Sequence, residues 1–151
     1  MEATKTQIQA RLQKVREIGF MMDYELLNSI PDLDKNKIRI QFGFQIEQSN
    51  EENIFILNVQ VVYAYPTNKG EKVLVDLKTT NHYEIQDLQS LVKYSKGEFQ
   101  DITGLLPTLL GISIGTLRGI LLVKTTGTIL ADFPLPIVNA TDLCKSVTNG
   151  K

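Results

Sequence analysis

Residues that could carry out nucleophilic or acid–base chemistry are few in this sequence. His82 is the only histidine and Cys144 the only cysteine, and they lie far apart along the chain. A cysteine nucleophile needs a histidine within hydrogen-bond reach, and a site with several histidine ligands cannot be assembled from one histidine. We therefore expect His82 to be an exposed residue at a strand end, and Cys144 to be a small buried apolar residue.

Carboxylates give little support for hydrolytic chemistry. The notable pairs are Glu51 with Glu52, Asp32 with Asp34, and Asp76 with Glu84. Most of them fall in segments rich in turn-forming residues, where solvation explains them. The glycine-rich segment matches neither the P-loop nor the G-x-G-x-x-G pattern of nucleotide sites. We predict a protein that is not an enzyme and that uses no cofactor or metal.

Composition indicates one compact domain. The chain has 151 residues, of which 42% are hydrophobic, and a fold of this length buries roughly 70% of the surface of its unfolded chain. With 16 basic and 17 acidic residues, it lacks the positive field that attracts nucleic acid. A single cysteine and an N-terminus without the apolar core of a secretory signal favour the cytoplasm.

One apolar segment, residues 105–123, has the length of a membrane span, which requires about 20 residues. Arg118 lies inside it, and a guanidinium at the centre of a bilayer costs at least about 2.5 kcal/mol. We predict that the segment is a helix of a folded domain and is not inserted in a membrane.

The N-terminal residues change period near position 17. Ile8, Leu12 and Val15 recur at helical spacing among polar residues, which predicts an amphipathic helix over residues 3–17. From Ile18 the apolar residues alternate, which predicts a strand over residues 18–26. We therefore expect a helical extension at residues 1–17 that precedes the main domain.

Three more segments have the pattern of strands. Residues 37–47 and 73–79, the latter extended to Ile85, alternate polar and apolar residues, whereas residues 54–65 are more continuously apolar, as suits a central strand. Short polar segments join them and no crossover helix intervenes, so antiparallel pairing follows. The sequence predicts an α+β protein with a four-stranded antiparallel sheet in meander order.

Helical patterns follow the strands. Leu88, Leu91, Val92 and Tyr94 indicate a helix that ends at a polar break over residues 95–101. A long apolar helix then begins near Leu105, and a short helix capped by Asn139 or Thr141 follows an extended proline-containing stretch. Residues 146–151 are expected to be a flexible tail. The long helix carries three glycines at intervals of four, which predicts close approach of another backbone along one face: Gly111, Gly115 and Gly119.

This order of elements resembles the SecB family of export chaperones. Residues 73–77 and 83–85 are similar to the family's fourth strand, in which an acidic position lies between hydrophobic residues. Residues 105–107, followed by Ser113, Arg118 and Gly119, resemble the start and middle of its main helix. Residues 135–139 resemble its proline-valine-asparagine signature. The resemblance covers roughly residues 18–144 and rests on the order of these motifs.

The resemblance implies a fold and a function. It implies a domain over residues 18–145, with helices packed on one face of the sheet and assembly as a dimer of dimers. Such a protein binds unfolded polypeptide without ATP, in grooves lined by aromatic and aliphatic residues, and docks on a SecA-type motor. The implied motor contacts are Leu74 and Asp76. The candidate groove residues are Phe42, Phe44, Tyr63, Tyr65 and Tyr83.

Other hypotheses remain open at this point. Phe42 and Phe44 also suit an ordinary core. The protein could instead be a small-molecule or lipid-binding α+β module with an enclosed cavity between helix and sheet. A third hypothesis is a SecB-like chaperone associated with an antitoxin, which recognises one partner protein.

Overall fold

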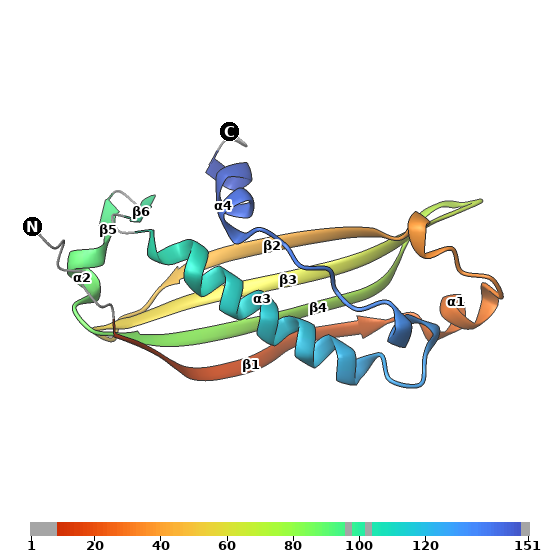
Figure 1. Cartoon of the computed structure of the whole chain (residues 1–151), viewed down its shortest axis with the longest axis horizontal. Coiled ribbons are helices and arrows are strands. Elements are labelled where there is room, and N and C mark those ends of the chain that lie inside the picture. The colour runs from red at the N-terminus through yellow and green to blue at the C-terminus, as the bar shows by residue number, and fades with distance from the viewer. Residues whose placement is uncertain (1–8, 96–97, 102–103, 149–151) are drawn as a thin grey trace, which may run out of the picture.

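The main sheet contains four strands, β1 (Ala10–Met22), β2 (Arg39–Gln48), β3 (Ile54–Thr67) and β4 (Gly70–Ile85). The structure, a computed structural model, describes residues 9–95, 98–101 and 104–148. Successive hairpins join β2, β3 and β4, and β1 pairs antiparallel with β4, so the order is β1-β4-β3-β2 (Figure 1). The predicted meander holds for β2 to β4, whereas β1 lies beside β4 instead of β2.

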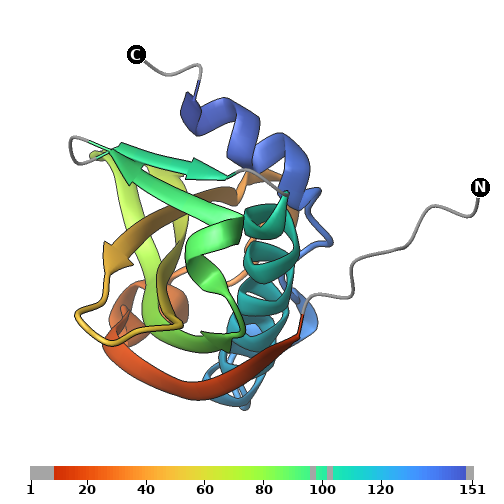
Figure 2. The ribbon, with the colours of Figure 1, turned by 90° about the vertical axis from the view of Figure 1, so that its left-hand side faces the viewer.

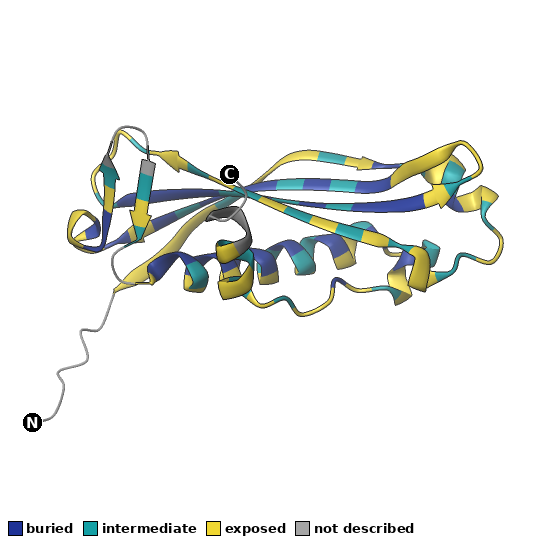
Figure 3. Cartoon of the chain, turned by 90° about the horizontal axis from the view of Figure 1, so that it is seen from above, coloured by how far each residue is buried: buried dark blue, intermediate teal, exposed yellow. Residues whose placement is uncertain are grey.

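Helices cover one face of this sheet. α3 (Leu105–Lys124) crosses the face formed by β3 and β4, and α4 (Ala140–Thr148) packs against α3. The opposite face carries no helix in the described part of the chain (Figures 2 and 3). The predicted α+β class, a four-stranded antiparallel sheet with helices on one face, is therefore confirmed.

Smaller elements lie at the two ends of the sheet. α1 (Tyr24–Ser29) and the 3-10 helix η1 (Lys35–Lys37) connect β1 to β2 across one end. α2 (Leu88–Leu91) and the hairpin of β5 (Val92–Ser95) and β6 (Glu98–Asp101) lie at the other end. A second 3-10 helix, η2 (Ile129–Asp132), follows α3 and leads through an extended stretch to α4.

The alternation in the sequence explains the two faces. Along β3, Leu57, Val59 and Val61 are buried on the side of α3, whereas Asn58 and Gln60 between them are only partly buried on the uncovered face. A strand with this pattern must direct one side of the sheet to the core and the other to water. In Figure 3 the strand residues coloured as buried lie mainly on the two central strands, β3 and β4.

The predicted N-terminal helix is wrong for residues 10–17, which belong to β1; residues 1–8 lie outside the described residues. β1 shifts register against β4 between Leu12 and Lys14 and between Glu17 and Gly19. Each extra residue changes the spacing of side chains on one face from two to three, so that Leu12 and Val15 face the same side. The bulges thus gave the apolar residues of β1 a spacing like that of a helix. β1 continues through residue 17, where the boundary between helical extension and main domain was predicted.

Two other predicted elements differ from the structure. The first strand ends at Met22, because the Asp23 carboxylate accepts a hydrogen bond from the Leu26 N–H at 2.9 Å and caps α1. The helix predicted through Tyr94 is a single turn, after which Val92 begins the β5–β6 hairpin. The final helix is present as predicted, with the Asn139 side chain accepting from the Asp142 N–H at 3.2 Å. The flexible tail predicted for residues 146–151 is wrong for residues 146–148, which belong to α4, and residues 149–151 lie outside the described residues.

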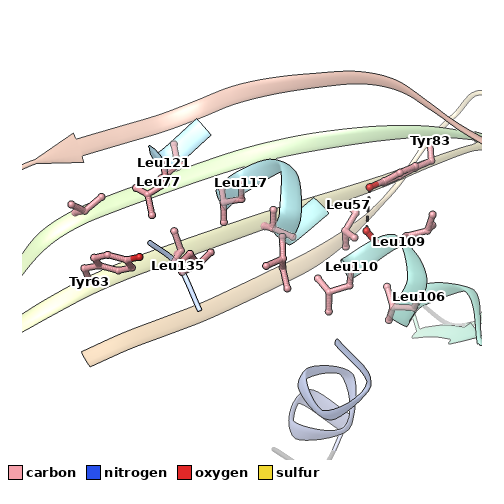
Figure 4. Close-up of a cluster of buried hydrophobic side chains, with 14 of the residues drawn as sticks. Leu57, Tyr63, Leu77, Tyr83, Leu106, Leu109, Leu110, Leu117, Leu121 and Leu135 are labelled. Atoms are coloured by element: carbon pink, nitrogen blue, oxygen red, sulfur yellow. Dashed lines mark hydrogen bonds between the residues drawn. The ribbon is translucent and has the colours of Figure 1, made fainter. Parts of the chain in front are cut away.

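The core lies between α3 and the sheet. Leu109, Leu110 and Leu117 of α3 are at most 1% exposed and belong to one cluster with Leu57 and Leu77 of the sheet (Figure 4). Burying one leucine side chain stabilises a fold by about 1.5–3 kcal/mol, so this contact accounts for much of the cohesion. By length and hydropathy α3 is similar to a membrane span, but 39% of its most apolar window is buried inside this fold.

Candidate functional site

The three tyrosines predicted to line a groove lie in the core. Tyr63, Tyr65 and Tyr83 are 0%, 8% and 1% exposed. The Tyr83 hydroxyl donates to the Leu109 carbonyl at 3.1 Å and lies 2.6 Å from the Ser113 hydroxyl. Held this way, these rings offer no surface to a bound chain.

Burial also changes the acidity of two of these phenols. Burial raises the pKa of Tyr63 to about 12, against a smaller lowering by the positive charge of Arg118. Burial raises the pKa of Tyr83 too, partly offset by the hydrogen bond with Ser113. Both phenols therefore stay neutral at physiological pH and serve the fold.

The two predicted phenylalanines lie closer to the surface. Phe42 and Phe44 are partly buried on β2, on the covered side of the sheet, and pack against the edge of the core. Ile40 and Ile46 continue the same row, and the residues between them are exposed. We call Ile40, Phe42, Phe44 and Ile46 the β2 strip. Part of each side chain packs against the core, which agrees with the alternative hypothesis that Phe42 and Phe44 are core residues.

β2 is an edge strand of the sheet. Within the described residues it pairs only with β3, so every second residue directs its backbone N–H and C=O away from the sheet. Unpaired N–H and C=O groups of this kind can form hydrogen bonds with another extended chain. Every second side chain of that chain would then lie beside the β2 strip. The β2 edge is the candidate site that the predicted groove residues help to form.

The two predicted motor-contact residues have different environments. Leu74 lies where β4 shifts register against β3, between the pairs of Tyr63 with Val75 and of Ala64 with Val73. Its side chain is 0% exposed, so a partner could contact it only if it left the core. Asp76 is partly buried and accepts a hydrogen bond from Gln60 Nε2 at 2.8 Å. Its cross-strand neighbours place it on the uncovered face, where a partner could reach it.

Apolar side chains are exposed at the other edge of the sheet and on α3. In β1, Leu12, Ile18 and Met21 are 38%, 49% and 43% exposed. In α3, Leu122 and Val123 are 42% and 75% exposed. We call the side of α3 that includes Leu122 and Val123 its outer face. Two charged residues of the helix are held by other contacts, since Arg118 donates to backbone carbonyls and Lys124 pairs with Glu17.

The glycines of α3 lie on this outer face. A Cβ built on Gly115 or Gly119 would meet nothing within 4 Å, and one on Gly111 would meet only the Cβ of Ala140 at 3.8 Å. The close backbone approach predicted for this face is therefore not made among the described residues. Spacing alone could place the glycines on one face but could not tell whether that face points inward.

Residues with catalytic potential are dispersed. His82 is partly buried on β4, three residues before the strand ends. Burial, with the negative charge of Asp101, raises the pKa of the Cys144 thiol, which opposes formation of a nucleophilic thiolate. Among the described residues, no group of three or more histidine, cysteine or acidic side chains is placed to hold a metal ion.

Comparison with known proteins gives little further information. No family model matches the sequence, and no curated protein matches it. Among solved structures, the chain is similar to a protein of unknown function from Streptococcus agalactiae, with 11% identity over 87% of this chain and 98% of that chain. The TM-score of 0.35 is too low to support an argument from this similarity.

Proposed function

We propose that this protein is a non-enzymatic, ATP-independent binder of unfolded polypeptide in the cytoplasm, a SecB-like holdase. The observation that supports it is that both edges of the main sheet, β1 and β2, are unpaired in the described chain and carry accessible apolar side chains. Soluble proteins usually protect such edges, because they template pairing with other chains. An edge left open is suited to a protein whose task is to bind extended chains.

The β2 edge is the proposed client site. An unfolded segment would add beside β2, with main-chain hydrogen bonds giving affinity and its alternate apolar residues contacting the β2 strip. Such binding tolerates many sequences because the backbone supplies most of the contacts. It requires no nucleotide.

The β1 edge and the outer face of α3 are proposed for self-association. Both carry exposed apolar side chains, and Figure 1 shows the C-terminal half of α3 lying near β1, where Lys124 Nζ pairs with Glu17 at 2.9 Å. A two-fold contact uses the same patch on both subunits, and a glycine-lined helix face can approach its own copy closely. A homodimer or homotetramer would bury both surfaces.

Participation in protein export is a narrower form of this proposal. Asp76 lies on the uncovered face of the sheet, where a SecA-type motor could contact it, whereas Leu74 is inaccessible in this conformation. A chaperone specific for one partner, such as one associated with an antitoxin, would use the same surfaces. The lipid-binding alternative needs an enclosed cavity between α3 and the sheet, whereas two clefts of the described chain, of about 580 and 190 Å³, are open to solvent and lie outside that core.

The direct test is suppression of aggregation. A chemically unfolded client is diluted with and without the protein, and light scattering is followed in the presence and absence of ATP, while the mass in solution is measured. We expect stoichiometric suppression that ATP does not change, by a dimer or tetramer. A monomer that protects no client would contradict the proposal.

A further inference from the structure

A cleft of about 580 Å³ opens at the end of the sheet where β2 turns into β3. It lies between that turn, α2 and β5, at the left of Figure 1. Three of its lining residues are buried and apolar, with Ile54, Leu88 and Val92 exposed by 8%, 6% and 3%. Its volume is within the range of about 300–1,000 Å³ that is typical of ligand sites. None of its residues belongs to the β2 strip.

Hydrogen bonds hold the two walls of the cleft. The Asn53 carbonyl accepts from the Ile85 N–H at 2.7 Å, and Asn53 Oδ1 accepts from the Leu88 N–H at 3.3 Å. Asn53 itself has a φ of 63°, a conformation that asparagine adopts more readily than most residues. Gln89 Nε2 donates to Glu52 Oε1 at 3.4 Å across the same junction. The turn and α2 are thus fixed relative to each other before any ligand binds.

The β5 wall is anchored by aromatic contacts. Phe99 of β6 packs edge-on against Phe55 of the sheet, with ring centroids 5.6 Å apart, and its ring lies 5.5 Å from that of Tyr94. Edge-on and tilted ring contacts of this kind add attraction beyond the burial of the rings. The hairpin is therefore held against the core.

An unpaired strand edge borders this cleft. Val92, Lys93 and Tyr94 of β5 line it, none of the described β6 residues does, and β5 pairs with β6 alone in the described chain. The cleft thus lies against a side of β5 on which β6 supplies no lining residue, and the second edge of β5 is also on the side away from β6. In an antiparallel pair every second residue directs its N–H and C=O away from its partner. The Val92 N–H is bonded to the Leu88 carbonyl, so the remaining outward main-chain groups of β5 are those open to a ligand.

The charged residues at the mouth of the cleft favour ligands of one charge pattern. Glu51 and Glu52 are exposed on one side, and Lys93 is exposed on the other. Two carboxylates against one ammonium favour a ligand with a basic residue beside its apolar one. The repeating donors and acceptors of an extended polypeptide match a strand edge, whereas a compact small molecule does not.

We propose that this cleft binds an extended polypeptide segment by strand addition to β5. One apolar side chain of the segment would contact Ile54, Leu88 and Val92, and a neighbouring basic side chain would lie near Glu51 and Glu52. This inference rests on the proposed function and adds a second, separate site for the same class of ligand.

The test uses a fluorescent nine-residue peptide that alternates leucine and lysine. We expect it to bind the full-length protein and to shift the amide resonances of residues 49–53 and 89–94. Asn50→Trp places a large ring on the cleft side of the β2–β3 turn and should weaken binding about tenfold. The matched control is Asn68→Trp, in the exposed turn between β3 and β4 at the other end of the sheet, which should bind as the parent does.

A second probe examines the main-chain contacts. The same peptide, N-methylated at alternate residues along one edge, keeps its side chains but loses the donors that would pair with β5. We expect one of the two N-methylation patterns to weaken binding about tenfold and the other to leave it unchanged. Absence of binding by the parent protein, resonance shifts confined to other regions, or full affinity of the Asn50→Trp variant would each overturn the proposal.

The outcome is separable from that of the proposed function. A protein that protects an unfolded client but does not bind the peptide at the cleft retains the proposed function and refutes the cleft site. A protein that binds the peptide at the cleft but protects no client supports the site and refutes the holdase.

Discussion

Two tyrosine hydroxyls of the core have opposite environments. The Tyr83 hydroxyl has two partners, the Leu109 carbonyl and the Ser113 hydroxyl, whereas the Tyr63 hydroxyl is buried with no hydrogen-bond partner within the described structure. A buried polar group without a partner carries a desolvation cost that no bond offsets. Tyr63 stays in place through its ring, which packs edge-on against Phe133 at 5.7 Å between centroids.

The first prediction compares the two matched substitutions. Tyr83→Phe removes a satisfied hydroxyl and should lower the free energy of unfolding by about 1 kcal/mol, whereas Tyr63→Phe should leave it unchanged or raise it. Urea unfolding of both variants measures the difference. Equal destabilisation by both would show that the Tyr63 hydroxyl has a partner, such as a buried water.

The second prediction concerns alkaline pH. Because burial raises the pKa of Tyr63 from 10.0 to about 12, the folded state keeps a proton that the unfolded state loses. The stability that this group contributes is fully present below pH 10.0 and is lost as the pH rises toward about 12. Tyr63→Phe should therefore make the fall of the unfolding free energy across this range shallower, with part of the slope left to Tyr83. An unchanged slope would contradict the raised pKa.

At the scale of elements, Arg118 joins α3 to the extended stretch before α4. Its Nε donates to the Leu135 carbonyl at 2.9 Å and its NH2 group to the Pro136 carbonyl at 3.1 Å. Proline has no N–H, so side-chain contacts of this kind substitute for the ladder that would fix an ordinary extended strand. The charge that argued against a membrane helix thus has a structural role.

The third prediction tests that junction. Arg118→Met keeps the apolar stem but removes both hydrogen bonds, and should cost about 1–3 kcal/mol of stability. It should also speed amide hydrogen exchange at Leu135 and at residues 137–139. Lys124→Met, on the same helix, removes a partly exposed ion pair with Glu17 and a cation–π contact with the Phe20 ring, each worth no more than about 1 kcal/mol. Similar exchange rates in both variants would refute the role of Arg118.

What the sequence could predict depended on local regularity. Residues 39–48 alternate without interruption, and the strand over 37–47 was predicted within two residues of β2. The first part of β1 was missed because two bulges gave it helical spacing, whereas residues 18–22 were predicted as strand. The resemblance implied a partner contact by Leu74, but the register shift against β3 turns its side chain into the core. Local patterns could name Phe42 and Phe44, but that β1 and β2 are the edges of the sheet depends on contacts between distant strands.

At the scale of the whole molecule, no described element packs on the outer face of α3 at Gly115 and Gly119. A helix that is apolar on nearly all sides is normally buried. The face includes Ile112, Leu122 and Val123, exposed by 46%, 42% and 75%, beside the open surfaces of Gly115 and Gly119. The exposed Ile18 and Met21 of β1 add to the apolar surface of the subunit. A surface of this kind is costly for a monomer, and a second copy of the chain would remove the cost.

The fourth prediction tests self-association through this face. A Cβ added at Gly115 meets no atom within 4 Å in the described chain, and Gly115→Leu replaces a poor helix former, so the isolated subunit should fold at least as well. If copies pack closely along the glycines, the new side chain blocks their approach and shifts a dimer or tetramer toward monomer. Sedimentation equilibrium over a concentration series measures the shift. Gln45→Leu, which adds the same side chain to an exposed position on the uncovered face of β2, should leave the mass unchanged. A Gly115→Leu protein with the parent's mass would instead direct the search for the subunit interface to the β1 edge, where only one side of the strand is paired.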